Sequence, residues 1–255
     1  MTMTIVRRAQ PWLGTLVSIE VVASAGLDLE AAFSHGFEAI ARVHRAMSPQ
    51  HADSDVARFN RVAGGATIRC DPWTLGVLRL AARVRHATDG LFDVALGTAQ
   101  GGAYRSAGVR RVEKIAGTAR IDLGGIAKGY AVDRAVQALR ARGVTRGLIN
   151  AGGDLRAFGA GSWPVIVRGV DGRPAMRLAL EGGAVATSVY RAGRSPFRND
   201  PLIAPENGRV HAIDQAITVA APSCALADAL TKVVALSGDT AHPLISRLGG
   251  RAWLH

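Results

Sequence analysis

Apolar residues in the first fifty positions of the chain follow two different periods. Between Thr15 and Val21 they alternate with less apolar residues, which is typical of a half-buried strand. The apolar positions that follow recur at helical spacing up to Pro49; they are Leu29, Phe33, Phe37, Ile40 and Val43. The pattern therefore predicts a strand followed by a long amphipathic helix.

Two further helices have recognisable ends. Asp71 and Pro72 combine an N-cap carboxylate with a proline in the first turn, and the helix they open is expected to end near Gly90. A second amphipathic stretch, residues 131–139, follows a glycine-rich turn and is closed by Gly143.

Strand patterns dominate the second half of the chain and follow one another without helices between them. We expect strands at residues 147–151, 164–168, 177–180, 184–187 and 216–220, then helices at 225–236 and 243–248 and a last strand at 251–254. Separated blocks of helices and strands favour an α+β fold with mainly antiparallel sheet layers over a doubly wound sheet. The 255 residues suit one compact body, residues 1–255, with a long active-site loop at 191–208.

Composition narrows the classes of partner. The net charge of +11 favours anionic ligands, but the basic residues are scattered and no nucleic-acid-binding motif accompanies them, so we expect no nucleic-acid partner. Two cysteines, Cys70 and Cys224, cannot build a disulfide framework and are expected to be buried. The short, interrupted apolar stretch near the N-terminus is neither a signal-peptide core nor a membrane span, which predicts a cytoplasmic protein.

The strongest chemical signal is the string DLGGIAKGYAVD from Asp122 to Asp133, where a strand passes through a glycine turn into a helix. Paired glycines allow the backbone to approach a ligand, and the helix N-terminus together with Lys128 attracts phosphate. Neither the pattern GxxxxGK[ST] nor GxGxxG occurs at this turn, which excludes a standard P-loop or Rossmann site. A glycine turn that merely caps the helix remains the alternative.

Several strings in the same order resemble the ApbE-type family of FAD:protein FMN transferases. They are LGTLVSIE, MSPQHADSDVARFN, DGLFDVALG, IDLGGIAKGYAVD, LINAGGDLRAFG, AVATS and ADALTK. The resemblance implies a T-fold-like α+β core that binds FAD and, with Mg²⁺, transfers FMN to a Thr or Ser hydroxyl of an acceptor protein. AMP is then the leaving group, and divalent cations and positioned donors neutralise the developing pyrophosphate charge in such chemistry.

The resemblance also implies roles for individual residues. The expected flavin-nucleotide contacts are Leu13, Gln50, Asp122, Lys128, Thr187 and Ile203. The expected metal ligands are the carbonyl of Gly125 and the side chains of Asp228 and Thr231, and the residues expected at the reaction are Asp228 and Lys232. Structural alternatives stay open: Asp228 as an exposed helix residue, Asp122 as a turn cap and Thr187 as an ordinary strand threonine.

The chain departs from the family's pattern in ways that weaken the step from fold to activity. Gln50 stands near a position that is often aromatic, so contact with the flavin ring is expected to weaken. The loop from Asp200 to Gly208 carries Ala204 and Asn207 where the family has Asp and Thr. The loop's usual histidine is absent, which leaves Asp200 or His211 as substitutes.

The metal helix usually reads Asp-x-x-x-Thr, but Lys232 occupies the threonine position here. Residues four apart share a helix face, so Lys232 is expected to pair with Asp228. The lysine either takes over part of the metal's charge or forms an ordinary exposed ion pair. Two alternatives to a transferase therefore remain: a non-catalytic flavin-binding or acceptor-binding protein, and an FAD pyrophosphatase.

Overall fold

A seven-stranded sheet organises the chain in the computed structural model, which describes residues 4–96, 102–191, 202–204 and 209–255. The strand order is β1-β2-β8-β9-β12-β13-β14. These strands are β1 (Ile5–Trp12), β2 (Thr15–Val22), β8 (Gly147–Ala151), β9 (Asp154–Phe158), β12 (Ala184–Tyr190), β13 (Gln215–Ala221) and β14 (Arg251–Leu254). Every strand pairing in the described residues is antiparallel, which confirms the α+β prediction.

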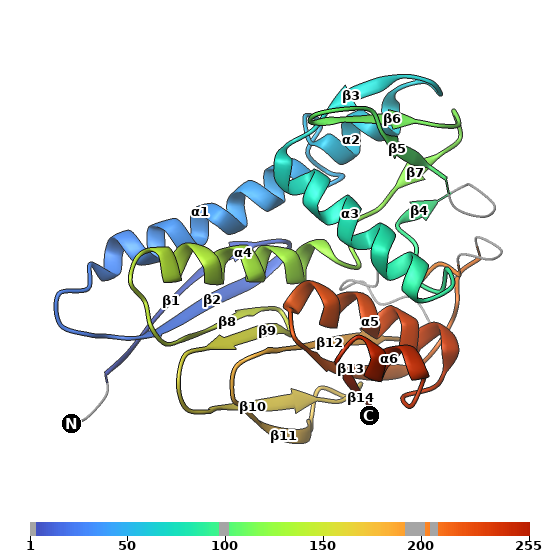
Figure 1. Cartoon of the computed structure of the whole chain (residues 1–255). Helices are drawn as coiled ribbons and strands as arrows, with labels where there is room; N and C mark the ends of the chain where they lie inside the picture. Colours follow the sequence, from blue (N-terminus) through green and yellow to red (C-terminus); the bar gives the residue numbers. More distant parts are fainter. Residues whose placement is uncertain (1–3, 97–101, 192–201, 205–208) are drawn as a thin grey trace.

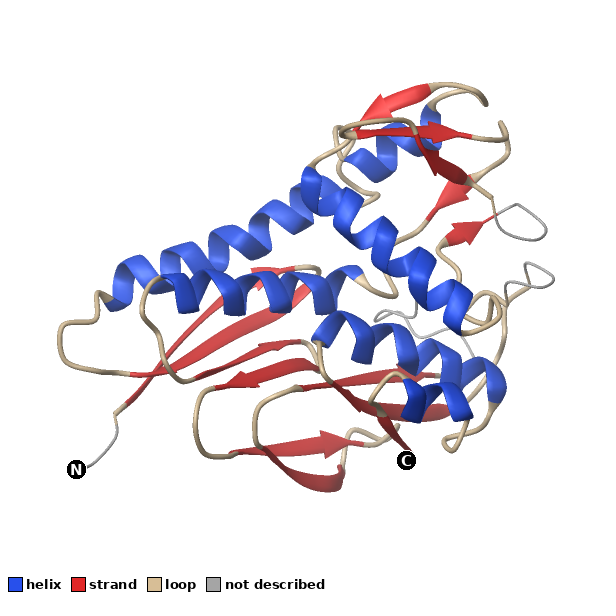
Figure 2. Cartoon of the chain, in the orientation of Figure 1, coloured by secondary structure: helices blue, strands red, loops and turns tan. Residues whose placement is uncertain are grey.

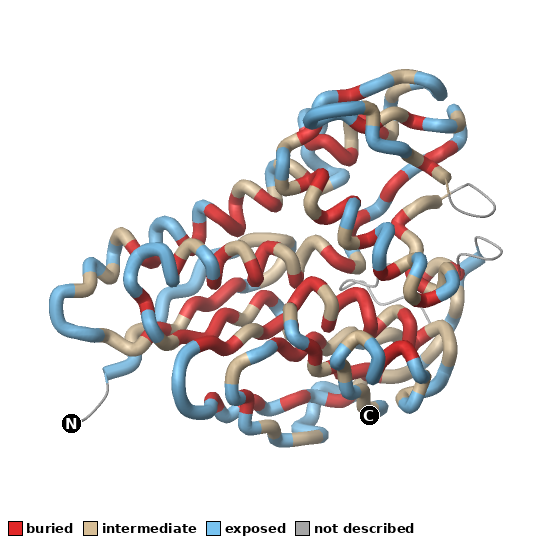
Figure 3. Tube along the Cα trace, viewed as in Figure 1, coloured by how far each residue is buried: buried red, intermediate tan, exposed pale blue. Residues whose placement is uncertain are grey.

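Four helices cover one face of this sheet (Figure 1). They are α1 (Leu29–Met47), α4 (Ala127–Ala141), α5 (Cys224–Ser237) and α6 (Pro243–Arg247). The inward positions of α1, α4 and β2 are fully buried, among them Ile40, Leu139 and Ile19. Burying one such side chain contributes about 1.5 to 3 kcal/mol, so this layer is the main source of stability. Figure 3 shows the buried segments concentrated between these helices and the strands beneath them.

A hairpin covers part of the opposite face of the sheet. It consists of β10 (Trp163–Arg168) and β11 (Pro174–Leu180), drawn below the main sheet in Figure 2. Trp163, Val165 and Leu180 of the hairpin form a second apolar cluster with Leu148 and Leu155 of the sheet. The sheet is thus buried on both sides in its central part.

The remaining elements form a smaller lobe beyond the end of α1 (Figure 1). The lobe contains α2 (Asp55–Arg61), α3 (Pro72–Ala87), a sheet of β3 (Thr67–Arg69), β6 (Arg111–Lys114) and β5 (Tyr104–Ser106), and the pair β4 (Ala95–Leu96) and β7 (Arg120–Ile121). Strand β7 leads directly into the glycine turn before α4, so the lobe is connected to the main body at the predicted site.

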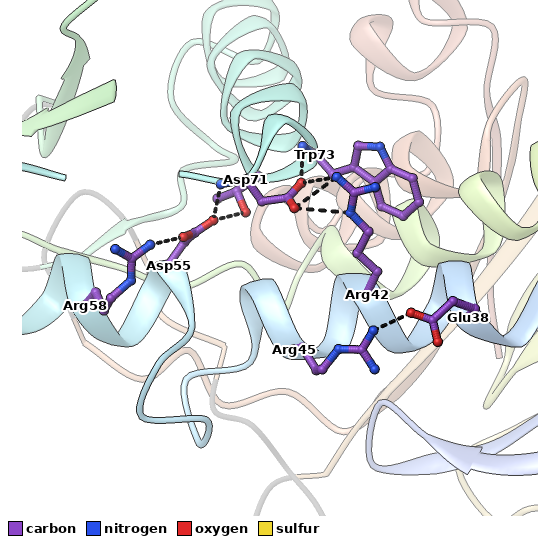
Figure 4. A network of polar contacts seen from close by, with 8 residues as sticks. Glu38, Arg42, Arg45, Asp55, Arg58, Asp71 and Trp73 are labelled. Atoms are coloured by element: carbon purple, nitrogen blue, oxygen red, sulfur yellow. Dashed lines mark hydrogen bonds and ion pairs between the residues drawn. The ribbon is translucent and has the colours of Figure 1, made fainter. Parts of the chain in front are cut away.

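A polar network fixes α1, α2 and α3 relative to one another (Figure 4). Asp71 caps α3 by accepting from the Trp73 amide at 2.8 Å, and it also binds the guanidinium of Arg42 on α1 at 3.0 Å. That guanidinium stacks on Trp73, 4.1 Å from the ring centroid. Buried Asp55 of α2 accepts from the Asp71 amide at 2.8 Å and from the Thr74 hydroxyl at 2.6 Å. The N-cap that the sequence predicts at Asp71 is therefore confirmed, and it is also a junction between helices.

The strand and helix predictions of the second half agree with the structure to within a few residues. Both cysteines are free and buried, as expected. The sequence patterns did not indicate β1, α2, β9 or the short strands of the lobe. Within the described ranges, no helix is long and apolar enough to cross a membrane. The proposed loop at 191–208 lies almost entirely outside the described residues.

Candidate functional site

The glycine turn before α4 brings the backbone close to a lysine from another helix. A Cβ atom added at Gly125 would lie 3.2 Å from Cε of Lys232 and 3.5 Å from Phe92, so a larger residue would displace the lysine. No side chain caps α4 at its N-cap residue, Ile126. Asp122 accepts from the Gly124 amide at 2.7 Å and is exposed, which supports its role as a turn cap. The amides of Ile126 and Ala127 donate to the Leu123 carbonyl at 3.0 and 2.8 Å, so the turn offers an anion mainly the ammonium of Lys128 beside the exposed Gly124.

Helices α4 and α5 cap each other with aspartates. Asp133 of α4 accepts from the amides of Cys224 and Ala225 at 2.9 and 3.0 Å, at the start of α5. Asp228 of α5 accepts from the amide of Gly129 at 3.3 Å, in the first turn of α4. Carboxylates are favoured at helix N-termini, where the free amides carry partial positive charge. The reciprocal capping holds Asp228 beside the glycine turn.

The helices can approach this closely because of Gly129. A Cβ at this position would lie 2.2 Å from the carbonyl oxygen of Cys224, far inside van der Waals contact. Glycine is therefore the residue that fits at the crossing. Lys128, one residue earlier, lies close to the start of β9 as a result.

Two lysines and two aspartates meet at this point. Nζ of Lys128 lies 2.9 Å from Oδ2 of Asp154, which begins β9. Lys232 pairs with the carboxylate of Asp228 one helical turn earlier. Both aspartates are completely buried, whereas the lysine side chains are 30% and 18% exposed. The prediction of an ion pair is confirmed, but the alternative of an exposed Asp228 is wrong, because the carboxylate lies under the helix crossing.

The environments of the two buried carboxyl groups differ. Burial and the neighbouring Asp228 together raise the pKa of Asp154 to about 6, against the opposing effects of Lys128 and Lys232. Burial also disfavours ionised Asp228, but Lys232, Lys128 and the Gly129 amide outweigh it and lower the pKa of Asp228. Asp228 therefore stays ionised to lower pH than Asp154 does, and Asp154 is the one of the two that takes up a proton first as the pH falls.

The two side chains expected to bind a metal, Asp228 and Thr231, have other partners. Thr231 donates its hydroxyl to the carbonyl oxygen of Asp228 at 2.7 Å, and Ser188 donates to Thr231 at 2.8 Å. Lys232 donates to the Asp228 carboxylate, to the Asp228 carbonyl at 3.2 Å and to the Ser188 hydroxyl at 3.3 Å. These three contacts use all three donors of the ammonium.

The donor set therefore does not fit Mg²⁺. Two unit charges 4 Å apart interact by about 4 kcal/mol at a protein surface, and a dication beside the ammonium would experience about twice that repulsion. Across the described positions, no group of three or more His, Cys, Asp or Glu side chains could hold a metal ion. Of the expected ligand set, Asp228 instead binds the Lys232 ammonium, Gly125 lies beside the Lys232 side chain, and Thr231 bonds to the Asp228 carbonyl.

An open hollow lies at the tip of the β1–β2 hairpin. It has a volume of about 430 Å³, and Trp12, Leu13, Thr15 and His44 are among the residues that line it. Leu13 adopts a φ of 54°, a conformation that suits the tight turn but is uncommon for leucine. Trp12 and His44 pack edge to face with ring centroids 5.9 Å apart, and His44 packs similarly on His51 at 5.1 Å.

The hairpin tip is next to the glycine pair before Asp154. A Cβ at Gly152 would lie 2.5 Å from the hydroxyl oxygen of Thr15, so the two turns touch. Asn150 accepts from the Gly153 amide at 3.0 Å and shapes this second turn. Gly153 in turn accepts from the amide of Thr187 on β12 at 3.0 Å. The open hollow at the hairpin tip and the charged cluster are therefore connected through the β8–β9 turn.

The other residues predicted to contact the ligand have no described contact with the charged cluster. Gln50 is exposed and accepts from the Ser48 hydroxyl at 2.7 Å. The hydroxyl of Thr187 pairs with that of Thr218 at 3.0 Å, as an ordinary strand threonine would. Ile203 forms an isolated bridge with Val210, and the described contacts do not join it to the cluster.

Ala204 and Asn207 depart from the family's loop pattern, and Asp200 and His211 are the expected substitutes for its histidine; of these four residues, the structure describes Ala204 and His211. Ala204 is buried, and the amide of half-buried His211 donates to Leu202 at 2.7 Å. Asp200 and Asn207 lie outside the described residues. Their predicted roles stay predictions.

Three residues of the site have no role in the sequence-based prediction. Asp154 closes the string NAGGD, Asp133 closes the string IDLGGIAKGYAVD, and Ser188 follows Thr187 in AVATS. Each of these residues lies inside a string that carries the family resemblance, which is the signal that could have found them. Their partners lie 26 to 92 residues away in sequence, so spacing alone could not reveal the contacts.

Sequence comparisons match the chain to one family of known proteins. A model described as the ApbE family matches residues 13–101 and 102–252. A protein of Treponema pallidum named FAD:protein FMN transferase is 26% identical over 88% of this chain and 76% of its own length. A protein of Vibrio cholerae with the same name is 23% identical over 90% of this chain and 80% of its own.

Solved structures show the same fold. The flavin transferase ApbE from Vibrio cholerae superposes with a TM-score of 0.82 at 21% identity, covering 99% of this chain and 94% of its own. The ApbE protein from Thermotoga maritima gives a TM-score of 0.85 at 23% identity, covering 98% and 94%. The T-fold-like α+β architecture expected from the resemblance is thereby confirmed.

Proposed function

Because this chain belongs to the ApbE family, we propose that it is an FAD:protein FMN transferase, the activity for which two of its relatives are named. The observation that carries the proposal is the cluster of Lys128, Asp154, Asp228 and Lys232 beside an exposed glycine turn. It combines two lysine ammonium groups with a partly exposed glycine turn, which suits the pyrophosphate of a dinucleotide.

The proposed reaction needs an acceptor hydroxyl, which belongs to a Thr or Ser of a second protein. The hydroxyl oxygen forms a bond to the phosphorus on the FMN side of FAD, and the bond from that phosphorus to the bridging oxygen breaks. AMP leaves with the electron pair, and the hydroxyl proton passes to a base or to solvent. Such reactions depend mainly on positioning and charge stabilisation.

Two groups of residues would bind two different parts of FAD. Lys128 and the glycine turn would bind the pyrophosphate, and the hollow at Leu13, Trp12 and His44 would take the flavin ring. Gln50 has no aromatic ring to stack on the flavin, but Trp12 and His44 offer aromatic surfaces that could do so. Contacts from Gln50, Asp122, Thr187 and Ile203 remain predictions.

A divalent cation would neutralise pyrophosphate charge in this chemistry, but the arrangement around Asp228 does not fit Mg²⁺. We therefore assign no step to a metal. Lys128 orients the phosphates, and the buried Asp228 and Asp154 hold the two lysines in place.

The cytoplasmic location expected from the sequence also stays a prediction.

Chromatography of the nucleotides separates this function from its two alternatives. The chain, FAD and an acceptor with an exposed Thr or Ser segment are incubated together, and AMP is measured with and without the acceptor. A transferase releases AMP only when the acceptor is present. AMP and free FMN without an acceptor would indicate a pyrophosphatase, and FAD binding without any AMP would indicate a non-catalytic binding protein; both results contradict the proposal.

A further inference from the structure

Lys232 stands at the point where the family resemblance predicts a metal ion. Its ammonium donates to the carboxylate and carbonyl of Asp228 and to Ser188, and its side chain passes along Gly125. Two of the residues expected to bind the cation, Asp228 and Gly125, thus lie against the lysine instead. The side chain is 18% exposed, so the charge lies at the edge of the site rather than in solvent.

The choice of lysine is unusual for this chain. Only three of its 31 basic residues are lysines, namely Lys114, Lys128 and Lys232. Lys114 is buried in the smaller lobe and donates to the carbonyl of Val62 at 2.9 Å. The other two lysines meet in the candidate site. A lysine presents a compact point charge, whereas the planar guanidinium used elsewhere in the chain is broader and would need more space beside Gly125.

The charges of the cluster balance without a metal. Lys128 and Lys232 face Asp154 and Asp228, and each aspartate is influenced by both lysines. The contacts of Lys232 to Ser188 and to the Asp228 carbonyl are its longer ones, at 3.3 and 3.2 Å, and a phosphate oxygen could replace either of them.

We infer that Lys232 is a built-in replacement for a divalent cation, so that this chain binds the flavin dinucleotide in a metal-independent way. The inference rests on the proposed function for the identity of the ligand. The statement about the metal is independent of the proposed function, because it concerns only Asp228 and Lys232. The chain therefore differs from a metal-dependent transferase in how it neutralises the pyrophosphate.

The first test uses the metal alone. Mn²⁺ is titrated into the full chain without nucleotide, and free Mn²⁺ is followed by electron paramagnetic resonance. The wild type is expected to show no site with submillimolar affinity, whereas Lys232→Thr, which frees the carboxylate and adds a hydroxyl, gains one. Wild-type binding as tight as that of the variant would overturn the inference whether or not FAD binds.

The second test measures FAD binding by quenching of flavin fluorescence, in EDTA and with added Mg²⁺. The wild-type dissociation constant is expected to change less than twofold between the two conditions. Lys232→Thr is expected to bind at least tenfold more weakly in EDTA and to recover with Mg²⁺, whereas Lys232→Met does not recover. A tenfold gain of the wild type on adding Mg²⁺ would overturn the inference, and this result needs no variant to fold. If the wild type binds no FAD under either condition, the proposed function fails, and the Mn²⁺ titration alone decides the metal question.

Discussion

Lys232 and Asp228 form an ion pair within one turn of α5, with the carboxylate fully buried at the first turn of α4. Removing one partner of a buried pair leaves an uncompensated charge, which is far more costly than the loss of a surface ion pair. The pair is therefore a structural part of the site and not an ordinary ion pair on the solvated helix surface.

Lys128→Met is expected to weaken FAD binding by at least tenfold. The substitution removes a cation that lies beside the glycine turn while keeping much of the side-chain volume, and hydrogen bonds to charged groups contribute about 1.5 to 3 kcal/mol. The measurement is a fluorescence titration with FAD. Arg247→Ala removes an exposed cation from α6 and serves as the control, which should bind like the wild type. Equal affinities for all three proteins would remove Lys128 from the ligand site.

Asp154 should make stability depend on pH in a direction opposite to an ordinary paired carboxylate. Burial raises its pKa to about 6 in the folded chain, against about 3.9 in an unfolded one, so the folded state binds the proton more tightly. Its contribution to stability is present below pH 4 and is lost as the pH rises through 6.

Chemical denaturation of the wild type and of Asp154→Asn at pH 5 and 7.5 checks this linkage. The wild type should lose about 1 kcal/mol relative to the variant over that interval. Taking the difference between the two proteins cancels the titration of groups that both contain. A constant difference, or one that changes in the opposite direction, would show that the pKa of Asp154 is not raised.

Asp133→Ala should destabilise the fold by about 2 to 4 kcal/mol. The side chain accepts from the Cys224 and Ala225 amides and pairs with Arg156, so its removal leaves buried donors and a cation without their acceptor. Urea unfolding monitored by circular dichroism gives the value. Asp171→Ala, at an exposed turn, should change the free energy of unfolding by less than about 0.5 kcal/mol. Similar small effects for both variants would argue against the capping role.

Gly129→Ala should lower stability by at least about 2 kcal/mol, because the added methyl group would overlap the Cys224 carbonyl and separate α4 from α5. Gly117→Ala is the matched control, since a Cβ there meets nothing closer than 3.8 Å. The midpoint and slope of thermal and urea unfolding compare the two. A neutral effect at Gly129 would mean that the helices do not cross as closely as described.

Local patterns were sufficient to predict much of the main body. The strand at Thr15, the helix from Leu29 and the cap at Asp71 depend on periodicity and nearby hydrogen bonds, which are visible in a short window. The short strands of the lobe have too few residues to show a period, and β9 begins directly after two glycines. These elements owe their form to partners distant in sequence.

The candidate site was predictable in part for the same reason. The glycine turn, Lys128 and Asp228 lie in strings that signal their chemistry. The contact of Lys128 with Asp154 and the capping of α5 by Asp133 depend on how β9, α4 and α5 pack. The burial of Asp228 likewise follows from that packing and could not be obtained from its position on a helix face.

The most direct test of the proposed function is the intact mass of the acceptor protein after incubation with this chain and FAD. The account predicts a single addition of one FMN group on a Thr or Ser, absent when Lys128→Met replaces the wild type at the same FAD concentration. An acceptor that stays unmodified by the wild type, while the Vibrio cholerae flavin transferase modifies it, would contradict the account.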